Sequence, residues 1–310
     1  MTTLHLGIDA GGSHTRAVLL DAAGTPLGRG RSGGGNPAGS DPAGTVEHLA
    51  AAVSAALGAR GPGRVESCLV GLAGYRALAD PDGFAQRCQA ALGLGCPVRI
   101  VPDTVPALAS GGVADGRGTV LIAGTGAICV RLDGARTLAR SGGLGWLLGD
   151  EGGGFWLGRE VLRRAHADPD SALGTAVRAH CAAGSEDELL RWAYAGPPRR
   201  LAGLAPLVSR LAADGDPGAL ALARAAADHL AGLVRATAAP TEPLVLTGSV
   251  ATSAGPIREH LLRRLSDLGP RLPTTDAATA AARLGADRPQ SPPTPPPGVR
   301  PRTFHARPPH

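Results

Sequence analysis

The stretch LGIDAGGSHTRAVLLD, residues 6–21, decides the fold. An apolar segment runs into Asp9 and a glycine pair, and a second apolar segment follows at once. In dinucleotide-binding folds and P-loops the glycines lead into a helix instead. The order therefore predicts two antiparallel strands joined by a glycine-rich turn, whose backbone N–H groups can hold an anion. A carboxylate at the mouth of such a turn can hold a phosphate-bound metal, although an ordinary tight hairpin shows the same pattern.

The same order returns in residues 119–133. An apolar stretch, residues 119–123, runs into the glycine turn at residues 124–126, and a second apolar stretch follows over residues 127–133. A supersecondary unit that recurs within one chain suggests a duplicated domain. We therefore expect two phosphate-binding turns, one in each half of the chain, that face each other.

The length and composition indicate a globular protein of about two domains, since the chain has 310 residues and a domain takes roughly 150. The chain contains no lysine. Walker A loops and enzymes that form Schiff bases both need one, so these two classes are excluded. Three of the five net positive charges lie in residues 287–310, and aromatic residues make up only 3%. We expect no nucleic-acid partner, because the rest of the chain has neither a basic stripe nor the aromatic residues needed for base stacking.

The cysteine pattern and the hydropathy pattern indicate a reducing compartment. Cys68, Cys88, Cys96, Cys129 and Cys181 form no Cys-x-x-Cys pair and are expected to be small buried or partly buried thiols. No basic segment followed by an apolar run stands at the N-terminus, and no stretch reaches roughly 18 consecutive apolar residues. These features predict a cytoplasmic protein with no membrane partner.

Periodicity and turn residues predict alternating strands and helices. Three strands are expected within residues 4–32, and further strands at residues 68–72 and 98–101; residues 244–249 are expected to form a strand with a glycine turn. Helices are expected at residues 45–57, 83–92, 104–110, 155–167, 201–213, 217–237 and 257–265. Residues 287–310 hold nine prolines and are expected to be a disordered tail.

Further motifs follow the first turn in a set order. They are GGGN at residues 33–36, GLAG at 71–74, Asp103 after a strand, GTG at 124–126, GGLGWLLGDEGGGFW at 142–156, and Gly248-Ser249 after a later strand. This set resembles the sugar kinase, heat-shock protein and actin superfamily, and within it the BadF/BadG/BcrA/BcrD-type ATPases and N-acetylglucosamine kinases. The Gly-Asp-Glu-Gly block with the aromatic pair after it is the most specific element.

The resemblance implies a fold and a set of roles. The fold is α/β, with two ribonuclease-H-like (actin-like ATPase) domains, residues 1–110 and 111–286, hinged around a cleft for ATP and a sugar. Asp9 would hold Mg²⁺ through water, and Asp103 would be the general base. The phosphate tail of ATP would lie along Gly11, Gly12, Ser13 and His14 on one side and Gly124, Thr125 and Gly126 on the other, with Gly248 and Ser249 near the adenosine. The sugar would contact Asn36, Asp103, Gly143, Gly145 and Asp150.

Each of these polar residues also has a structural interpretation. Asp103 and Asp150 could each cap the helix that follows. Asn36 lies in a sequence typical of a loop. His14 stands where relatives often carry lysine or arginine, so positive charge at the phosphates is weaker, and Leu144 and Trp146 differ from the pattern expected in the animal acetylglucosamine kinases.

The resemblance implies an ATP-dependent kinase that phosphorylates an amino sugar at the 6-hydroxyl, with N-acetylglucosamine ahead of glucosamine, glucose and N-acetylmannosamine. One alternative is an ATPase that activates a dehydratase, which needs an iron–sulfur cluster. Cys129 is the single cysteine near a glycine turn, and no partner for it is obvious. The other alternative is a non-catalytic sugar or nucleotide sensor, in which Asp103 would have no purpose. A homodimer through the helical C-terminal half stays open.

Overall fold

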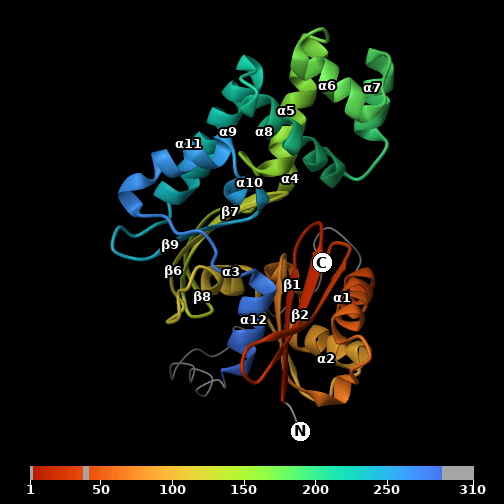
Figure 1. Cartoon of the computed structure of the whole chain (residues 1–310), viewed down its shortest axis with the longest axis vertical. Coiled ribbons are helices and arrows are strands. Elements are labelled where there is room, and N and C mark those ends of the chain that lie inside the picture. Colours follow the sequence, from red (N-terminus) through yellow and green to blue (C-terminus); the bar gives the residue numbers. More distant parts are fainter. Residues whose placement is uncertain (1–2, 38–41, 288–310) are drawn as a thin grey trace, which may run out of the picture.

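The computed structural model describes residues 3–37 and 42–287, arranged as two lobes along the long axis of the molecule (Figure 1). The disordered tail is expected over residues 287–310, and all of it except Asp287 lies outside the described residues. None of the described helices is both long enough and apolar enough to cross a membrane.

The first lobe is built on a five-stranded sheet with the order β3-β2-β1-β4-β5. Its strands are β1 (Leu4–Ala10), β2 (Thr15–Asp21), β3 (Pro26–Ser32), β4 (Val65–Leu72) and β5 (Val98–Pro102). The pairs β1–β2 and β2–β3 are antiparallel, whereas β4 runs parallel to both β1 and β5. The prediction that the first glycine turn joins two antiparallel strands is confirmed.

The second lobe repeats this arrangement in a sheet with the order β8-β7-β6-β9. Its strands are β6 (Arg117–Ala123), β7 (Ala127–Asp133), β8 (Arg136–Gly142) and β9 (Leu244–Thr247). Again the first three strands form an antiparallel meander, and the fourth pairs in parallel with the first. The order reproduces β3-β2-β1-β4, so the predicted duplication is present in the topology.

Helices cover both sheets. The first lobe carries α1 (Pro42–Leu57) and α2 (Pro81–Leu92), with short 3₁₀ turns η1 (Pro62–Arg64) and η2 (Tyr75–Ala77). The helices that follow β8 are α4 (Gly145–Leu148), α5 (Gly154–Ala167), α6 (Ala172–Cys181), α7 (Glu186–Tyr194), α8 (Ala205–Ala213), α9 (Pro217–Arg235), α10 (Ser249–Thr252), α11 (Pro256–Arg264) and α12 (Ala277–Ala286), with η3 (Pro198–Leu204) and η4 (Ser266–Leu268). Helix α3 (Thr104–Ser110) packs against α12 and β6, and its Ala107 and Leu108 share a core with the second sheet.

The prediction of a single helix over residues 201–213 is wrong about where the helix begins. The chain forms the 3₁₀ segment η3 first, and α8 begins only at Ala205 with Pro206 in its first turn. Proline lacks the N–H that a continuing helix needs and is favoured at a helix start, so Pro206 begins a new helix.

Both lobes have aliphatic cores. Leu6 and Ile8 of β1 are fully buried and pack with Leu49 of α1 and Phe84 of α2 in the first lobe. The helical part of the second lobe has its own core around α5, α8 and α9. A chain with 3% aromatic residues therefore fills its interior with leucine, valine and alanine.

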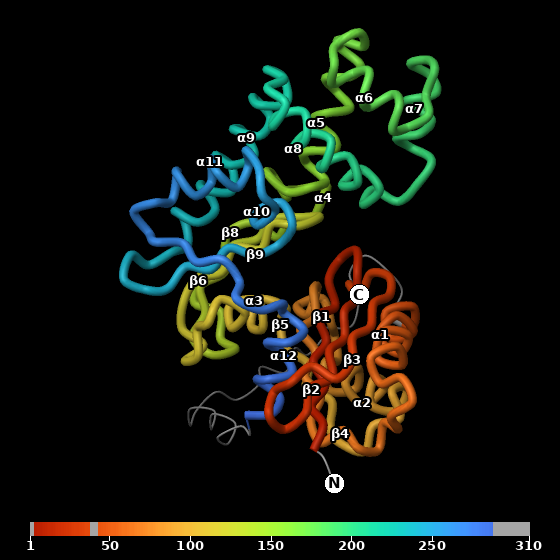
Figure 2. The backbone as a smooth tube through the Cα atoms, viewed as in Figure 1, coloured from red at the N-terminus to blue at the C-terminus, as the bar shows by residue number. Residues whose placement is uncertain are grey.

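Helix α12 returns from the second lobe to the first sheet. It packs against β1, β2 and β4, and Figure 2 shows this blue end of the chain beside the red strands. The contact is close because Gly7 has no side chain, and a Cβ atom there would clash with the backbone of Ala278 and Ala282. The first lobe thus takes its last helix from residues 277–286, which the expected division placed with the second half; that division at residue 110 stays a proposal.

Gly7→Val is expected to displace α12 and lower the free energy of unfolding by about 1–3 kcal/mol, the usual effect of overpacking. Urea unfolding measures it. Gly61→Ala is the matched control, because nothing lies within 4 Å of a Cβ atom at Gly61. Equal stability of the two variants would contradict the packing described for α12.

Candidate active site at the two glycine turns

The two glycine turns meet between the lobes. Ser13 Oγ in the first turn lies 2.6 Å from Thr125 Oγ1 in the second, a hydrogen bond between residues 112 positions apart. The turns leave donors unused, since no protein acceptor within the described part of the chain takes the N–H groups of Gly12, Ser13, Thr125 or Gly126. Free N–H groups in consecutive turn residues form a site for an anion.

The first turn is closed by its own backbone and supported by the GGGN segment. Gly11 N donates to His14 O at 2.9 Å, and Gly35 N donates to Gly11 O at 2.8 Å. Gly34 packs so close to Gly12 that a Cβ atom would clash with the Gly12 carbonyl oxygen. This packing delivers Asn36, which is half-buried, next to the first turn.

The second turn is braced by the Gly-Asp-Glu-Gly block. Asp150 Oδ1 accepts a hydrogen bond from Ala127 N at 3.1 Å, and a Cβ atom on Gly126 would lie 2.6 Å from the same carboxylate. Helix α5 begins against the turn, because Gly154 N donates to Gly124 O and Phe155 N donates to Thr125 O. Asp150 therefore does not cap α5, whose N-cap is Gly153. Burial raises the pKa of Asp150.

Asp103 directly precedes α3 but makes no side-chain capping hydrogen bond. Burial raises the pKa of Asp103 to about 7, and the neighbouring Asp9 carboxylate adds to the shift. The interpretation of the Asp103 side chain as a helix cap is therefore wrong, although the backbone N–H groups of Thr104 and of Asp103 itself oppose part of the pKa shift. A raised pKa from desolvation beside a second charge is typical of functional carboxylates.

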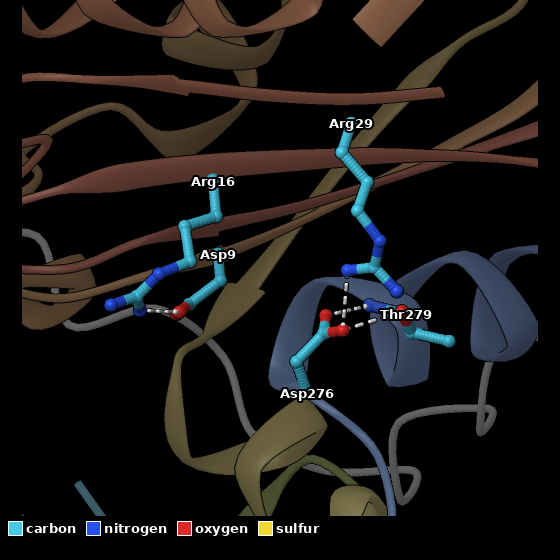
Figure 3. Close-up of polar contacts among 5 residues, drawn as sticks. All are labelled: Asp9, Arg16, Arg29, Asp276 and Thr279. Carbon is cyan, nitrogen blue, oxygen red and sulfur yellow. Dashed lines mark hydrogen bonds and ion pairs between the residues drawn. The ribbon is translucent and has the colours of Figure 1, made fainter. Parts of the chain in front are cut away.

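Asp9 lies near the end of β1; β4 runs parallel to β1 and β5 runs parallel to β4, so all three strands end at the same edge of the sheet. Asp103 follows β5, so both carboxylates belong to this edge. Asp9 Oδ2 forms an ion pair with Arg16 Nη1 at 3.4 Å (Figure 3). Burial raises the pKa of Asp9, Arg16 opposes the shift, and the carboxylate of Asp276 adds to it.

Asp276 belongs to a second ion pair beside the first. It accepts hydrogen bonds from the backbone N and the hydroxyl of Thr279 at the start of α12, and its Oδ2 lies 2.7 Å from Arg29 Nη1 (Figure 3). Although burial opposes it, these bonds lower the pKa of Asp276. This pair anchors α12 to β3 near Asp9.

A resident metal ion does not fit the described residues, which contain no group of three His, Cys, Asp or Glu side chains with metal-binding geometry. Magnesium, however, is usually held by one or two carboxylates together with the phosphates of the substrate. A single carboxylate at the mouth of a turn that can hold phosphates fits that mode, and Asp9 provides it.

Arg16 and Arg31 are cations near the first turn that the sequence reasoning missed. Desolvation lowers the pKa of His14, and these two arginines lower it further, which favours the neutral imidazole. The position of Arg16 could have been predicted from the hairpin register, because a turn over residues 11–14 places Arg16 directly opposite Asp9.

The remaining predicted site residues lie around the second turn. Gly248, with φ of +86°, packs against the Ala123 backbone just before the turn, and Ser249 follows it. Gly143 and Gly145 also have positive φ and lie in an exposed segment that includes α4, where Trp146 is 48% exposed and its ring centroid lies 5.6 Å from that of Phe155. No hydrogen bond between described residues joins Asp103 to Asp150.

All five cysteines are buried and unpaired, as expected. Cys129 lies in the core of the second lobe, where burial raises the pKa of its thiol to about 12. A cluster ligand must be a thiolate. The iron–sulfur alternative therefore finds no support at this cysteine.

Asp150→Ala is expected to lower the free energy of unfolding by about 1–3 kcal/mol, because Ala127 N loses its acceptor. Alanine also tolerates the φ of +65° less well than aspartate does. Asp150→Asn keeps an acceptor oxygen and this tolerance, so a smaller loss is expected in urea unfolding. If the two variants were equally destabilised, Asp150 would not be a brace of the second turn.

Comparison with known proteins gives the family. The sequence profile of the BadF/BadG/BcrA/BcrD ATPase family matches residues 6–265. An N-acetyl-D-glucosamine kinase from Dictyostelium discoideum is 28% identical over 230 residues, which are 69% of this chain and 72% of that protein.

Solved structures share the fold. A protein provisionally described as an N-acetylglucosamine kinase, from Chromobacterium violaceum, superposes with a TM-score of 0.73 at 26% identity, over 91% of this chain and 98% of that one. A ROK family glucokinase from Streptomyces griseus gives a TM-score of 0.57 at 21% identity, over 91% and 99% of the two chains. The predicted actin-like ATPase fold is thus confirmed, and because the family profile matches most of its length, the chain belongs to the BadF/BadG/BcrA/BcrD ATPase family.

Proposed function

We propose that this chain is an ATP-dependent kinase that phosphorylates N-acetylglucosamine at its 6-hydroxyl, with Asp103 as the general base. The observation that carries the proposal is the uncapped carboxylate of Asp103, whose pKa is raised to about 7, at the same sheet edge as Asp9 and the first glycine turn. A general base works best when its pKa lies near the operating pH.

The relatives support the substrate class. The Dictyostelium discoideum kinase aligns over 230 residues, well beyond a single motif. A second relative, an N-acetylmuramic acid/N-acetylglucosamine kinase from Clostridium acetobutylicum, is 39% identical over 74 residues, or 24% of each chain. Both relatives are described as kinases of an amino sugar, and ATP use agrees with the family.

The two turns would hold the phosphates of ATP. Phosphoryl transfer has a loose transition state, so catalysis depends mostly on positioning and charge neutralisation. The N–H groups of Gly12, Ser13, Thr125 and Gly126 are free to donate to phosphate oxygens from both lobes. The Ser13–Thr125 hydrogen bond must open to admit the phosphates, which frees two further hydroxyl donors. Gly11 and His14 complete the first side, Gly124 completes the second, and Gly248 and Ser249 would contact the adenosine.

Asp9 would hold Mg²⁺ against these phosphates, and the ion would neutralise charge on the transferred group. Arg16 holds the Asp9 carboxylate in the structure described here and must give up that contact. Asp103 would accept the proton of the 6-hydroxyl as its oxygen attacks the γ-phosphorus, and ADP leaves with the electron pair of the broken bond. Asn36, Gly143, Gly145 and Asp150 would position the sugar, the last three through the loop that also braces the second turn.

Asp103→Asn is expected to lower kcat/KM for the sugar by about 10²–10⁴-fold, the usual contribution of a general base. A coupled assay of ADP release measures it. Asp82→Asn, on the exposed surface of α2, is the matched control and should act like the native chain. The base assignment fails if the Asp103→Asn variant is folded and retains native activity.

The pH dependence of stability provides a control that the Asp103→Asn variant is folded. Because the pKa of Asp103 rises from 3.8 to about 7 on folding, its contribution to stability is fully present below about pH 4 and is lost as pH rises from about 4 through about 7. Asparagine cannot ionise, so the Asp103→Asn variant should be at least as stable as the native chain above pH 7. Urea unfolding at a series of pH values from about 4 to about 8 tests this.

Activity is expected to increase with pH, whereas the contribution of Asp103 to stability decreases. The base must be ionised, so kcat/KM should rise with pH and level off above about pH 7. Below that point it should fall tenfold for each pH unit. A profile that is flat across this range would rule out Asp103 as the ionising base.

A panel of sugars tests the substrate. N-acetylglucosamine, glucosamine, glucose and N-acetylmannosamine are compared by ADP release with and without Mg²⁺. The proposal expects the highest kcat/KM for N-acetylglucosamine and no turnover without the metal. A preference for glucose or glucosamine would reject the N-acetyl assignment and keep the kinase.

A further inference from the structure

A basic hollow of about 380 Å³ lies on the second lobe between α9 and α11, away from the glycine turns. Its lining consists of Arg224, Asp228, His260, Arg263 and Arg264. Figure 1 shows α11 at the outer edge of this lobe. None of the residues assigned to ATP or sugar belongs to it, so the proposed kinase reaction leaves this hollow unused.

The charges around the hollow are unbalanced. Arg264 Nε lies 2.7 Å from Asp228 Oδ1, and this ion pair uses the one carboxylate in the lining. Arg224 and Arg263 have no carboxylate within ion-pair distance among the described residues. Two guanidinium groups therefore line the same hollow without an ion pair among the described residues.

The side chain of His260, which also lines the hollow, lies within the electrostatic influence of Arg224 and Arg263. Its Nδ1 lies 2.5 Å from Arg263 Nη2 and accepts a hydrogen bond, because a guanidinium can only donate. Burial lowers the pKa of His260, Arg263 and Arg224 lower it further, and Glu259 and Asp228 oppose the shift. Because Nδ1 accepts the hydrogen bond of Arg263, the neutral imidazole carries its proton on Nε2, which is a third donor beside the two arginines.

We propose that this hollow binds the phosphate group of a small phosphorylated metabolite or inorganic phosphate. Guanidinium groups match the oxygens of phosphate in forked geometry, and two of them balance its double negative charge. The hollow falls in the size range of small-molecule sites, roughly 300–1,000 Å³. A monocarboxylate would neutralise only one of the two unpaired arginines.

The proposal is tested on the full chain through the ring proton of His260, observed by NMR and identified by its loss in the His260→Gln variant. Sulfate is the first probe, since it stays doubly charged where phosphate titrates. A bound dianion stabilises the imidazolium, so saturating sulfate should raise the pKa of His260. Because the reporter lies in the hollow, anions bound at the glycine turns do not enter the measurement.

In the Arg224→Gln/Arg263→Gln double variant, the apparent Kd of sulfate, measured from the shift of the His260 resonance, should rise by about tenfold or more. Without sulfate it should itself raise the pKa of His260, because both lost charges lower it. Arg210→Gln, an exposed arginine of α8 outside the hollow, is the matched control and should bind sulfate as the native chain does.

Two further probes distinguish the source of the phosphate. If glucose 6-phosphate binds more tightly than inorganic phosphate, the hollow also contacts the organic part of a phosphate ester; if the two bind equally, free phosphate is the ligand. The proposal is overturned if none of the three anions shifts the His260 resonance, or if the double variant responds like the native chain. No kinase activity enters this measurement, so its outcome is independent of the proposed reaction.

Discussion

Close approach of backbone to backbone is the constraint on which the candidate site depends. Gly34 lies on the Gly12 carbonyl, and Gly248 lies on the backbone of Ala123. A side chain at either position would push the supporting segment away from its turn. With both turns supported in this way, Ser13 and Thr125 form a hydrogen bond across the lobes, and this contact brings together two turns that both carry unused N–H groups. The glycine content of these motifs thus serves packing as well as phosphate binding.

Electrostatics in the first lobe follow from the same compactness. Asp9 and Asp103 share one sheet edge, and burial raises the pKa of both carboxyl groups. The carboxylate of Asp276 adds to the shift of Asp9, and the carboxylate of Asp9 adds to the shift of Asp103. Arg16 opposes the shift of Asp9, whereas Asp103 has no ion-pair partner among the described residues and has a pKa of about 7. The lobe therefore distinguishes two carboxylates of similar position, one paired with an arginine and one able to accept a proton. Such a separation is what assigns acid–base roles in a site.

Much of the fold could be predicted from local order. The run from Leu6 to Asp21 predicts a hairpin because two apolar strands flank a glycine turn, and the repeat at residues 119–133 predicts its counterpart. Asp103 could be found because it follows a short strand. The return of α12 to the first sheet could not, since an alanine-rich helix carries no mark of the sheet it will cover. The start of α8 was missed because the helical period continues through Pro206.

Some features of the candidate site could likewise be predicted from the local sequence, and others could not. Residue order alone indicates the two turns, Asp9, Asp103 and the glycine block, because each depends on neighbours a few positions away. Other features of the site depend on contacts between separate segments. Asp150 braces the second turn, Arg16 pairs with Asp9, and Asp276 ties α12 to β3 beside that pair. Arg224 and His260 likewise share a hollow only once α9 packs on α11. Local patterns specify turns and strands because backbone hydrogen bonds and periodicity are short-range. The folded chain decides which charges meet, because burial and Coulomb interaction depend on distance in space and not on distance along the chain.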